Sequence, residues 1–295
     1  MNKQNFPTAV SITHQHIVAI INSFIENGNQ EKKKSRVRIL DVGCGNGRLL
    51  SHILEVLPML QPSIQFDVFG LDVTDARQQR ASYMEETKQF LSQRHPLIEW
   101  NNQLSLISVH DVWPFPDNSF DFITSNQVLE HVRDYDFAFR EIHRCLRTEG
   151  VSINIFPTRE VLWEGHALMP FVHKVRNVRR RAKLILFFAK LGFKALYYGE
   201  MDRRGWRSLE EFAEVFAHVL ETDTNYLTAR ELAQVAERAT LKASFIYTKD
   251  YFLSKLFSYF GHRTYMYKNL GLIDKLGYLG GRYIASVTFL LRKDN

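Results

Sequence analysis

Three glycines at alternate positions follow an acidic residue in the stretch VRILDVGCGNGRLL, residues 37–50. The acid is Asp41, and the glycines are Gly43, Gly45 and Gly47. Glycine has no Cβ, so a loop of this composition lets a ligand approach the peptide groups closely. Such a loop at the end of a buried strand is typical of a nucleotide or nucleoside site in an open parallel sheet.

The spacing of these glycines separates two kinds of nucleotide site. A dinucleotide site carries G-x-G-x-x-G, in which the third glycine allows tight packing of helix and strand beside a pyrophosphate. In this chain Arg48 occupies that position, and the third glycine comes one residue earlier. A dinucleotide-dependent oxidoreductase is therefore disfavoured.

Two more acids follow apolar runs further along the chain. Asp72 ends the run FDVFGLD, where a carboxylate can accept hydrogen bonds from both hydroxyls of a ribose. Asp111 follows LSLISVH, where its carboxylate can accept a hydrogen bond from an exocyclic amine. Together the three strand ends offer bare backbone, a ribose acceptor and an amine acceptor. The ligand they predict is a nucleoside without a demanding phosphate.

The elements that must position these residues alternate along the chain. Near-continuous apolar runs alternate with helical patterns: the runs are VRILDVG, FDVFGLD, LSLISVHD, FDFITSN and VSINIFP. Helices are expected from about Asn46, from about Asp75 and up to Leu146, with no helix between the third and fourth runs. This alternation indicates crossover units and a parallel sheet covered by helices on both faces. We therefore predict an α/β, Rossmann-like fold.

The chain divides into four expected parts. Residues 1–35 form an N-terminal helix and a linker, and residues 36–158 form the cofactor-binding core. Residues 159–227 contain no clear strand and form a helical insertion that caps the substrate side. Residues 228–295 complete the sheet, because KASFIYTKD and RYIASVTFLLRK are typical of strands.

The order and spacing of these motifs resemble the class I S-adenosylmethionine-dependent methyltransferases, particularly the type 11 group of small-molecule enzymes. The resemblance covers residues 36–158 and rests on ILDVGCGNGRLL, on the strand that ends at Asp72 and on HDVWPFPDNSFDFITSNQVLEHV. It implies S-adenosylmethionine as the cofactor and a seven-stranded, mostly parallel sheet. One departure is Thr148-Glu149-Gly150, where the family usually has Pro-Gly-Gly, and it alters only a surface turn.

The resemblance also implies which residues bind the cofactor. Asp41, Gly43 and Gly45 would hold its aminoacyl end, and Asp72 with Val73 would hold the ribose. For Asp41 the alternative is that the carboxylate only caps a turn or a helix.

Segments later in the chain are expected to contact the adenine and to form the wall of the site. By the same resemblance, Asp111 and the amide of Val112 would contact the adenine, and Asn126 with Gln127 would form the cofactor wall. Asn126 has the same alternative as Asp41, a structural cap. The N-terminal helix, with His14 and His16, would form part of a lid.

Methyl transfer from a sulfonium is an in-line displacement, so catalysis depends mainly on positioning the reactants and excluding water. A hydroxyl acceptor also benefits from a base whose pKa lies near neutrality. The first candidate is His166 oriented by Glu164, in WEGHALMPFVHK, which is similar to a segment of type 11 enzymes that modify sugars or glycans. His131, in LEHV, is the second. The alternative for Glu164 and His166 is a polar hinge into the insertion. The alternative for His131 is a structural residue at the start of a helix.

The insertion carries a basic amphipathic segment, KVRNVRRRAKLILFFAKLGFKALYY, residues 174–198. Apolar side chains at helical spacing occupy one face, and lysines and arginines lie mostly elsewhere. This pattern suits a cap over the active site, contact with an anionic membrane surface or a lipid-linked substrate, or the face of a homodimer.

Composition sets looser bounds. The 295 residues include 38 Lys and Arg against 32 Asp and Glu, a formal charge of +6 that weakly favours anionic partners. The two cysteines, Cys44 and Cys145, predict reduced thiols, and the histidines and acids lack a metal-ligand spacing. No signal peptide or membrane span is predicted, so we expect a cytoplasmic protein, with peripheral membrane contact left open.

The function expected from these features is O-methylation of a small-molecule, sugar, glycan or lipid-linked acceptor. An RNA methyltransferase is an alternative suggested by the arginine-rich segment. Against nucleic acid, SNQV stands where amino-methylating nucleic-acid enzymes have Asn/Asp-Pro-Pro-Tyr, and no RNA-binding module is visible. A further alternative is a catalytically silent partner subunit that still binds S-adenosylmethionine.

Overall fold

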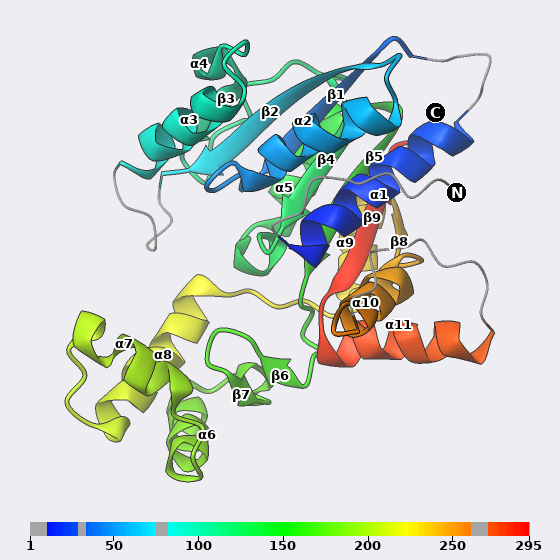
Figure 1. Cartoon of the computed structure of the whole chain (residues 1–295). Helices are drawn as coiled ribbons and strands as arrows, with labels where there is room; N and C mark the ends of the chain where they lie inside the picture. The colour runs from blue at the N-terminus through cyan, green and yellow to red at the C-terminus, as the bar shows by residue number, and fades with distance from the viewer. Residues whose placement is uncertain (1–10, 29–33, 75–81, 261–270, 295) are drawn as a thin grey trace.

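The centre of the computed structural model, which describes residues 11–28, 34–74, 82–260 and 271–294, is a seven-stranded sheet (Figure 1). Its order is β3-β2-β1-β4-β5-β9-β8. Strands β1 to β5 are parallel, and β9 runs antiparallel to both β5 and β8. The strands are β1 (Arg36–Val42), β2 (Gln65–Val73), β3 (Leu104–Ile107), β4 (Phe120–Asn126), β5 (Leu146–Phe156), β8 (Lys242–Ser244) and β9 (Val287–Arg292). The predicted α/β fold with a mostly parallel sheet is confirmed.

Helices cover both faces of this sheet, because apolar side chains cover both faces of its central strands. Residues of α1, α2, α3 and α10 pack on one face, and residues of α5 and α9 pack on the other. The helices around the sheet are α1 (Ile12–Asn27), α2 (Arg48–Leu60), α3 (Tyr83–Arg94), α4 (Trp100–Gln103), α5 (Tyr135–Cys145), α9 (Ala229–Arg238), α10 (Thr248–Ser258) and α11 (Leu272–Ile284), with a 3-10 turn η2 (Leu129–His131).

The inserted segment, which we call the cap, has a small apolar core of its own beyond the carboxyl end of β5 (Figure 1). In α6, Ile185 and Ala189 are fully buried in this core, with Phe212 and Phe216 of α8. The cap contains β6 (Trp163–Glu164), β7 (Met169–Pro170), a 3-10 turn η3 (Val172–Lys174), α6 (Val178–Lys190), α7 (Ala195–Arg204) and α8 (Leu209–Asp223).

Several predicted elements have different bounds. The insertion contains the β6–β7 hairpin as well as helices. Only residues 242–244 of KASFIYTKD form a strand, and α10 follows because the Thr248 hydroxyl accepts a hydrogen bond from the Thr288 amide of β9 at 3.0 Å. Residues 282–284 of RYIASVTFLLRK end α11, and β9 begins only at Val287.

The helix expected from Asn46 begins at Arg48, because Gly47 precedes it in the left-handed conformation. The helix expected from Asp75 is described from Tyr83 onward, and residues 75–81 lie outside the described residues. Part of the predicted linker, residues 29–33, also lies outside them. Among the described helices, none has the length and apolar composition needed to cross a membrane.

Candidate active site

A cavity of about 230 Å³ opens at the carboxyl ends of β1 and β4. It is lined by His14, Asp41, Gly43, Cys44, Gly45, Asn46, Leu49 and Asn126. The predicted loop thus lies where ligands bind in open parallel sheets, beyond the carboxyl ends of the strands. One wall comes from α1, because His14 belongs to that helix.

All three glycines of the loop have positive φ, and two of them, Gly43 and Gly45, line the cavity. Gly43 has φ 70°, and a Cβ built on it would lie 2.3 Å from Cγ2 of Val128, so only glycine fits there. Gly45 has φ 49°, and a Cβ on it would meet only the Gly43 carbonyl oxygen, at 3.9 Å. The loop is therefore closed against Val128 on one side and open on the cavity side.

Asp41 is a buried carboxylate at the floor of the cavity. Its Oδ1 accepts a hydrogen bond from the Thr124 hydroxyl of β4 at 2.9 Å. Burial, with a smaller contribution from the charge of Asp72, raises the pKa of Asp41 to about 7 despite that hydrogen bond. A cationic ligand group would lower this pKa again, because it favours the ionised form.

Asp72 ends β2 with its carboxylate directed to the glycine loop. Its Oδ2 accepts a hydrogen bond from the Gly45 amide at 2.8 Å, and its Oδ1 accepts one from the Val73 amide at 2.8 Å. The side chain is almost fully buried. Asp72 is thus hydrogen-bonded to the glycine loop, although neither Asp72 nor Val73 is among the residues that line the cavity.

Two buried polar atoms in the cavity lining lack a hydrogen-bond partner within the described chain, Oδ1 of Asn126 and Nδ1 of His14. Burial, with repulsion from His52 and Arg48, lowers the pKa of His14 to about 4, so the ring is neutral at neutral pH. Buried polar groups are normally satisfied, so these two atoms indicate a polar ligand in the cavity. A small cavity with a carboxylate, an open glycine loop and two such atoms fits the aminoacyl end of S-adenosylmethionine.

Three further predicted cofactor residues, in addition to Asp72 and Val73, lie outside the cavity lining. Asp111 is exposed on the loop after β3, and its Oδ2 accepts a hydrogen bond from the Ser108 amide at 2.9 Å. Val112 beside it is also exposed. Gln127 has φ 57°, and its side chain donates to the Ser286 hydroxyl at 3.3 Å, on the side of β9.

A second polar cluster joins the cap to the core. Nδ1 of His166 lies 2.7 Å from Oε1 of Glu164 and 3.0 Å from the Tyr226 hydroxyl. The Tyr226 hydroxyl donates to the same Glu164 oxygen at 2.7 Å. Burial alone would lower the pKa of His166, but the hydrogen bond and charge of the fully buried Glu164 outweigh it and raise this pKa above its usual value.

His131 reaches this cluster from the sheet side. Its ring meets the His166 ring edge to face, with centroids 5.1 Å apart. Nδ1 of His131 donates to the Asp223 carbonyl at 2.6 Å, because a carbonyl can only accept. Desolvation by its surroundings outweighs that hydrogen bond and, with repulsion from His166, lowers the pKa of His131. The ring is then neutral near pH 7, and its Nε2 is the acceptor.

Glu130, the neighbour of His131, is a buried acid beside the same histidines. Its Oε2 has no hydrogen-bond partner among the described residues, and burial raises its pKa to about 8. The charge of Glu164 contributes to this increase. At neutral pH Glu130 is therefore mostly a neutral acid.

The cavity and the second cluster share one short turn. Val128 lies against Gly43, and the His131 amide donates to the Val128 carbonyl at 2.9 Å. On the other side, the Asn225 amide from the end of the cap donates to the Glu130 carbonyl at 2.6 Å. The predicted residues His131, Glu164 and His166 are thus brought together in one cluster, and the turn that carries His131 also contacts the glycine loop.

Sequence reasoning did not single out Glu130, Asp223 and Tyr226 in this cluster. Each is an ordinary polar or aromatic residue, and Asp223 and Tyr226 lie at the end of the cap, far along the chain from Glu164. No spacing rule connects Tyr226 with Glu164, so only the folded chain reveals this contact.

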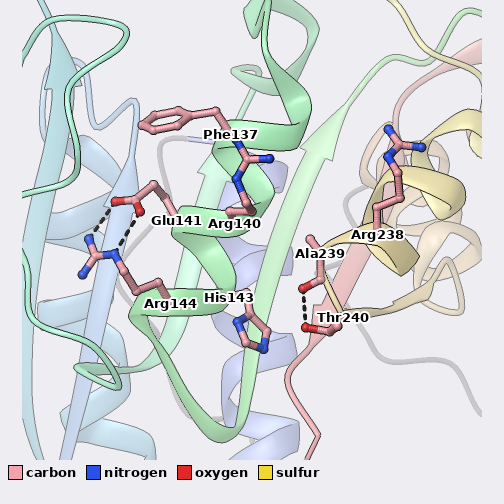
Figure 2. Close-up of a pocket in the computed structure, with 8 residues that line it drawn as sticks. All are labelled: Phe137, Arg140, Glu141, His143, Arg144, Arg238, Ala239 and Thr240. Atoms are coloured by element: carbon pink, nitrogen blue, oxygen red, sulfur yellow. Dashed lines mark hydrogen bonds and ion pairs between the residues drawn. The ribbon is translucent and has the colours of Figure 1, made fainter.

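A larger cavity, about 420 Å³, lies between α5 and α9 (Figure 2). Its charged side chains are largely paired, because Arg144 binds Glu141 and Asp117. The Glu141 carboxylate also accepts a hydrogen bond from the Trp113 amide at 2.8 Å. This cavity contains none of the predicted site residues. Within the described chain, no group of three or more His, Cys, Asp or Glu is arranged to hold a metal ion.

The basic segment of the cap uses its apolar face internally. Ile185 and Ala189 are buried against α8, and Arg181 is buried as well. The Arg181 side chain donates to the Ala217 carbonyl at 2.9 Å and pairs with Glu221 at 2.8 Å. Phe187 and Leu191 remain exposed on this helix and just after it.

Comparison with known proteins agrees with this geometry. A family model described as a methyltransferase domain matches residues 14–243. The chain therefore belongs to this family, which confirms the predicted class, an S-adenosylmethionine-dependent methyltransferase, and its cofactor.

The chain is also similar to two curated proteins. The chain is 29% identical over 218 residues to a sterol 24-C-methyltransferase of Pneumocystis carinii, covering 68% of this chain and 48% of that protein. It is 29% identical over 113 residues to a malonyl-[acyl-carrier protein] O-methyltransferase of Legionella pneumophila, covering 38% of this chain and 34% of that protein. The chain thus spans half or less of the length of these relatives. Among solved structures, the YcgJ protein of Bacillus subtilis aligns with a TM-score of 0.47 at 16% identity, covering 96% of this chain and 100% of that one.

Proposed function

We propose that this protein transfers the methyl group of S-adenosylmethionine to a hydroxyl of a small-molecule, sugar, glycan or lipid-linked acceptor. The observation that carries the proposal is the pair of histidines, His131 and His166, which the turn after β4 connects to the glycine loop through Val128. A neutral imidazole nitrogen beside a cofactor cavity is suited to accept the proton of a hydroxyl nucleophile.

Each part of the cavity has a proposed role toward the cofactor, which supplies the electrophilic methyl group when bound. Asp41 would bind the amino group, and Asn126 and His14 would bind polar atoms of the aminoacyl end. Gly45 would offer open backbone, and Asp72 with Val73 would hold the ribose. Asp111 and Val112 would contact the adenine from the loop after β3, and Gln127 would support the wall.

The histidines would act on the acceptor side. Glu164 fixes Nδ1 of His166 as a donor, and the Asp223 carbonyl does the same for His131. In each ring Nε2 is then the atom that can take a proton. His131 is the more available base at neutral pH because its lowered pKa keeps the ring unprotonated, whereas Glu164 raises the pKa of His166.

The surroundings favour an acceptor with an apolar part. Leu162, Trp163, Leu168 and Phe171 of the β6–β7 hairpin are large apolar residues with exposed side chains, and His166 lies in the same hairpin. The sterol relative is named for an apolar acceptor. A lipid-linked acceptor therefore has the most support among the classes above.

Calorimetric titration with S-adenosylmethionine and with S-adenosylhomocysteine tests the cofactor site. We expect binding in the micromolar range and a loss of at least about tenfold for Asp72→Ala, since it removes the proposed ribose contact. Asp67→Ala is the matched control, because Asp67 lies on the same strand and pairs with Arg36 at 3.2 Å, away from the loop. Unchanged affinity in Asp72→Ala would remove the basis of the proposal.

Acceptor class is tested by incubating the protein with methyl-labelled cofactor and separate lipid, glycan, RNA and protein fractions. The expected result is label in a lipid or glycan fraction, stable to conditions that cleave esters. Label only in RNA would overturn the proposed acceptor, and cofactor binding without label in any fraction would indicate a silent partner subunit.

A further inference from the structure

The packing of α11 on α10 reverses the usual arrangement of an amphipathic helix. Its buried residues are Gly277, Gly280 and Gly281. A Cβ on Gly280 would lie 2.3 Å from the Phe252 ring of α10, and one on Gly281 would lie 2.4 Å from Thr248. The helix thus presents its smallest residues to the protein.

The large apolar residues of α11 point to solvent instead. Leu272 is 70% exposed, Leu276 is 58% exposed and Leu279 is 47% exposed. These residues follow one another at intervals of four and three, so they share one stripe of the helix. Ile273 beside this stripe is also exposed. Isolated exposed leucines are common, but a full stripe on one helix indicates a contact surface.

The end of α10 adds to this apolar surface. Leu256, Tyr259 and Phe260 are exposed, with Tyr259 at 80% and Phe260 at 73%. Helices α10 and α11 pack along each other, and α11 lies on the outside of α10 in Figure 1. We call the exposed residues Leu256, Tyr259, Phe260, Leu272, Ile273, Leu276 and Leu279 the α10–α11 face.

The charges beside the α10–α11 face have one sign. Each helix contains a single acid: Asp250 is buried, and Asp274 is mostly buried and pairs with Lys249 at 2.8 Å. Lys255 and Lys275 are exposed, and they lie four residues before Tyr259 and Leu279 respectively. An apolar stripe bordered by lysines without exposed acids is complementary to an anionic lipid surface.

The α10–α11 face is also connected to the candidate active site. The Leu162 amide, just before the β6–β7 hairpin, donates to the Tyr283 carbonyl of α11 at 2.7 Å. Arg282 of α11 forms an ion pair with Glu160 of the same connection. Beyond α11, Ser286 accepts the hydrogen bond from Gln127 at the end of β4. A surface on α11 is therefore joined directly to the segments that carry His166 and border His131.

We propose that the α10–α11 face rests on an anionic membrane, with its leucines and aromatic side chains in the interface and Lys255 and Lys275 at the headgroups. This inference rests on the proposed function, because it makes the membrane the source of a lipid-linked acceptor. It assigns membrane contact to α10 and α11 rather than to α6, whose apolar face is already buried in the cap.

Co-sedimentation of the full chain with vesicles tests this proposal. One set of vesicles contains phosphatidylcholine with phosphatidylglycerol, and the other contains phosphatidylcholine alone. We expect stronger binding to the anionic set, and a loss of about tenfold or more when Leu272, Leu276 and Leu279 are all changed to serine. Lys255→Gln and Lys275→Gln should each weaken binding about fivefold, and only to the anionic vesicles.

Two control variants locate the contact. Leu97→Ser changes a leucine that is 98% exposed between α3 and α4. These helices lie beside β3, at the opposite edge of the sheet from β9 and α11 (Figure 1). Phe187→Ser with Leu191→Ser changes the exposed apolar residues at the end of α6. Both should bind vesicles as the unmodified protein does. Equal binding by the triple serine variant, or greater loss in the α6 variant, would overturn the proposal.

Two further readouts keep the outcomes distinct. Sedimentation velocity without vesicles detects a dimer, and a dimer that the triple serine variant dissociates would assign the face to a second copy and overturn membrane contact. Cofactor titration of the triple variant should match the unmodified protein, which shows that it is folded. If the unmodified protein binds vesicles but no cofactor, the proposed function fails while the membrane contact stands.

Discussion

His131 and His166 meet edge to face, with ring centroids 5.1 Å apart, although one belongs to the turn after β4 and the other to the hairpin of the cap. Their surroundings shift the pKa values of the two rings in opposite directions. Glu164 raises the pKa of His166 against the effect of burial, whereas desolvation lowers the pKa of His131. Neighbouring groups whose pKa values are driven apart are a common basis for dividing acid and base roles.

The first prediction concerns the base. His131→Gln should lower kcat by about a hundredfold, because it removes the neutral Nε2 acceptor. The affinity for S-adenosylmethionine should change by less than about twofold, since His131 is absent from the cavity lining. Steady-state kinetics and calorimetry measure the two effects. His143→Gln, on α5 away from the cluster, is the control, and a kcat that does not change would contradict the role of His131.

A second prediction follows from the ion pair of Glu164 and His166. With Glu164 present, the pKa of His166 is above its usual value, so neutral His166 accumulates only as the pH rises past that pKa. Glu164→Gln removes the charge, so burial should dominate and lower the pKa of His166. A titration of the His166 ring by NMR should show this midpoint moving to lower pH, with the His110 signal as an internal reference. A midpoint that moves to higher pH would contradict the ion pair.

Glu130 should make folding stability depend on pH. Its pKa is about 8 in the folded chain and lower when unfolded, so the folded state retains a proton that the unfolded state loses. Its contribution is fully present below the unfolded pKa and is lost as the pH rises through about 8. Glu130→Gln should therefore be more stable than the unmodified protein near pH 9, by about 1–3 kcal/mol.

Guanidinium unfolding at about pH 6 and about pH 9 measures this difference. Glu214→Gln is the control, because the Glu214 side chain is exposed on α8. If Glu130→Gln is destabilised equally at both values, the carboxyl group is ionised in the folded protein and the interpretation fails.

Asp41 should couple cofactor binding to pH. Its pKa is about 7 in the free protein, and the positive amino group of the cofactor favours the ionised carboxylate. Affinity should therefore fall as the pH drops below about 7. Asp41→Asn should bind about tenfold more weakly above that pH and lose most of this dependence. Calorimetry across the range decides the point, with Asp67→Asn expected to retain the full dependence.

The close contact of α10 and α11 can be tested at one glycine. Gly280→Ala places a methyl group against the Phe252 ring and should destabilise the protein by about 1–3 kcal/mol. Gly199→Ala, in α7, has open space around the new Cβ and should be neutral or slightly stabilising. Thermal unfolding of both variants measures the effect. Equal stability would show that the two helices are less closely packed.

The parallel core could be predicted because its signals are local. Each strand from β1 to β5 is an apolar run, and Asp41 and Asp72 occupy strand ends, where parallel topology brings side chains to one edge. The glycine loop was recognisable because its conformation requires glycine, as at Gly43, where Val128 excludes a Cβ. The parallel core thus followed from local patterns, whereas the strand order β3-β2-β1-β4-β5 was not predicted.

The C-terminal elements could not be predicted in the same way. Helix α11 contains Gly277, Gly280 and Gly281, which disfavour a helix locally, and its formation depends on packing against Phe252 and Thr248. Strand β8 ends at Ser244 because the chain turns into α10, which Thr248 ties to β9. These choices are made by tertiary contacts between distant segments, which a single-sequence pattern does not contain.

For the same reason, only part of the candidate base cluster could be predicted from the sequence. Glu164 and His166 are neighbours in the sequence, but Tyr226 and Asp223 reach them only after the whole cap has folded. Glu130 resembles a surface acid in the sequence and becomes buried when Asn225 binds its carbonyl.

The turn after β4 touches the glycine loop through Val128 and the end of the cap through Asn225. We expect an acceptor that orders the cap to order the glycine loop as well, because both contact this turn. Such an acceptor would raise the affinity for S-adenosylmethionine. By thermodynamic reciprocity, S-adenosylmethionine would then raise the affinity for the acceptor by the same factor. We expect the two substrates to bind with positive cooperativity, with no subunit contact needed to transmit it.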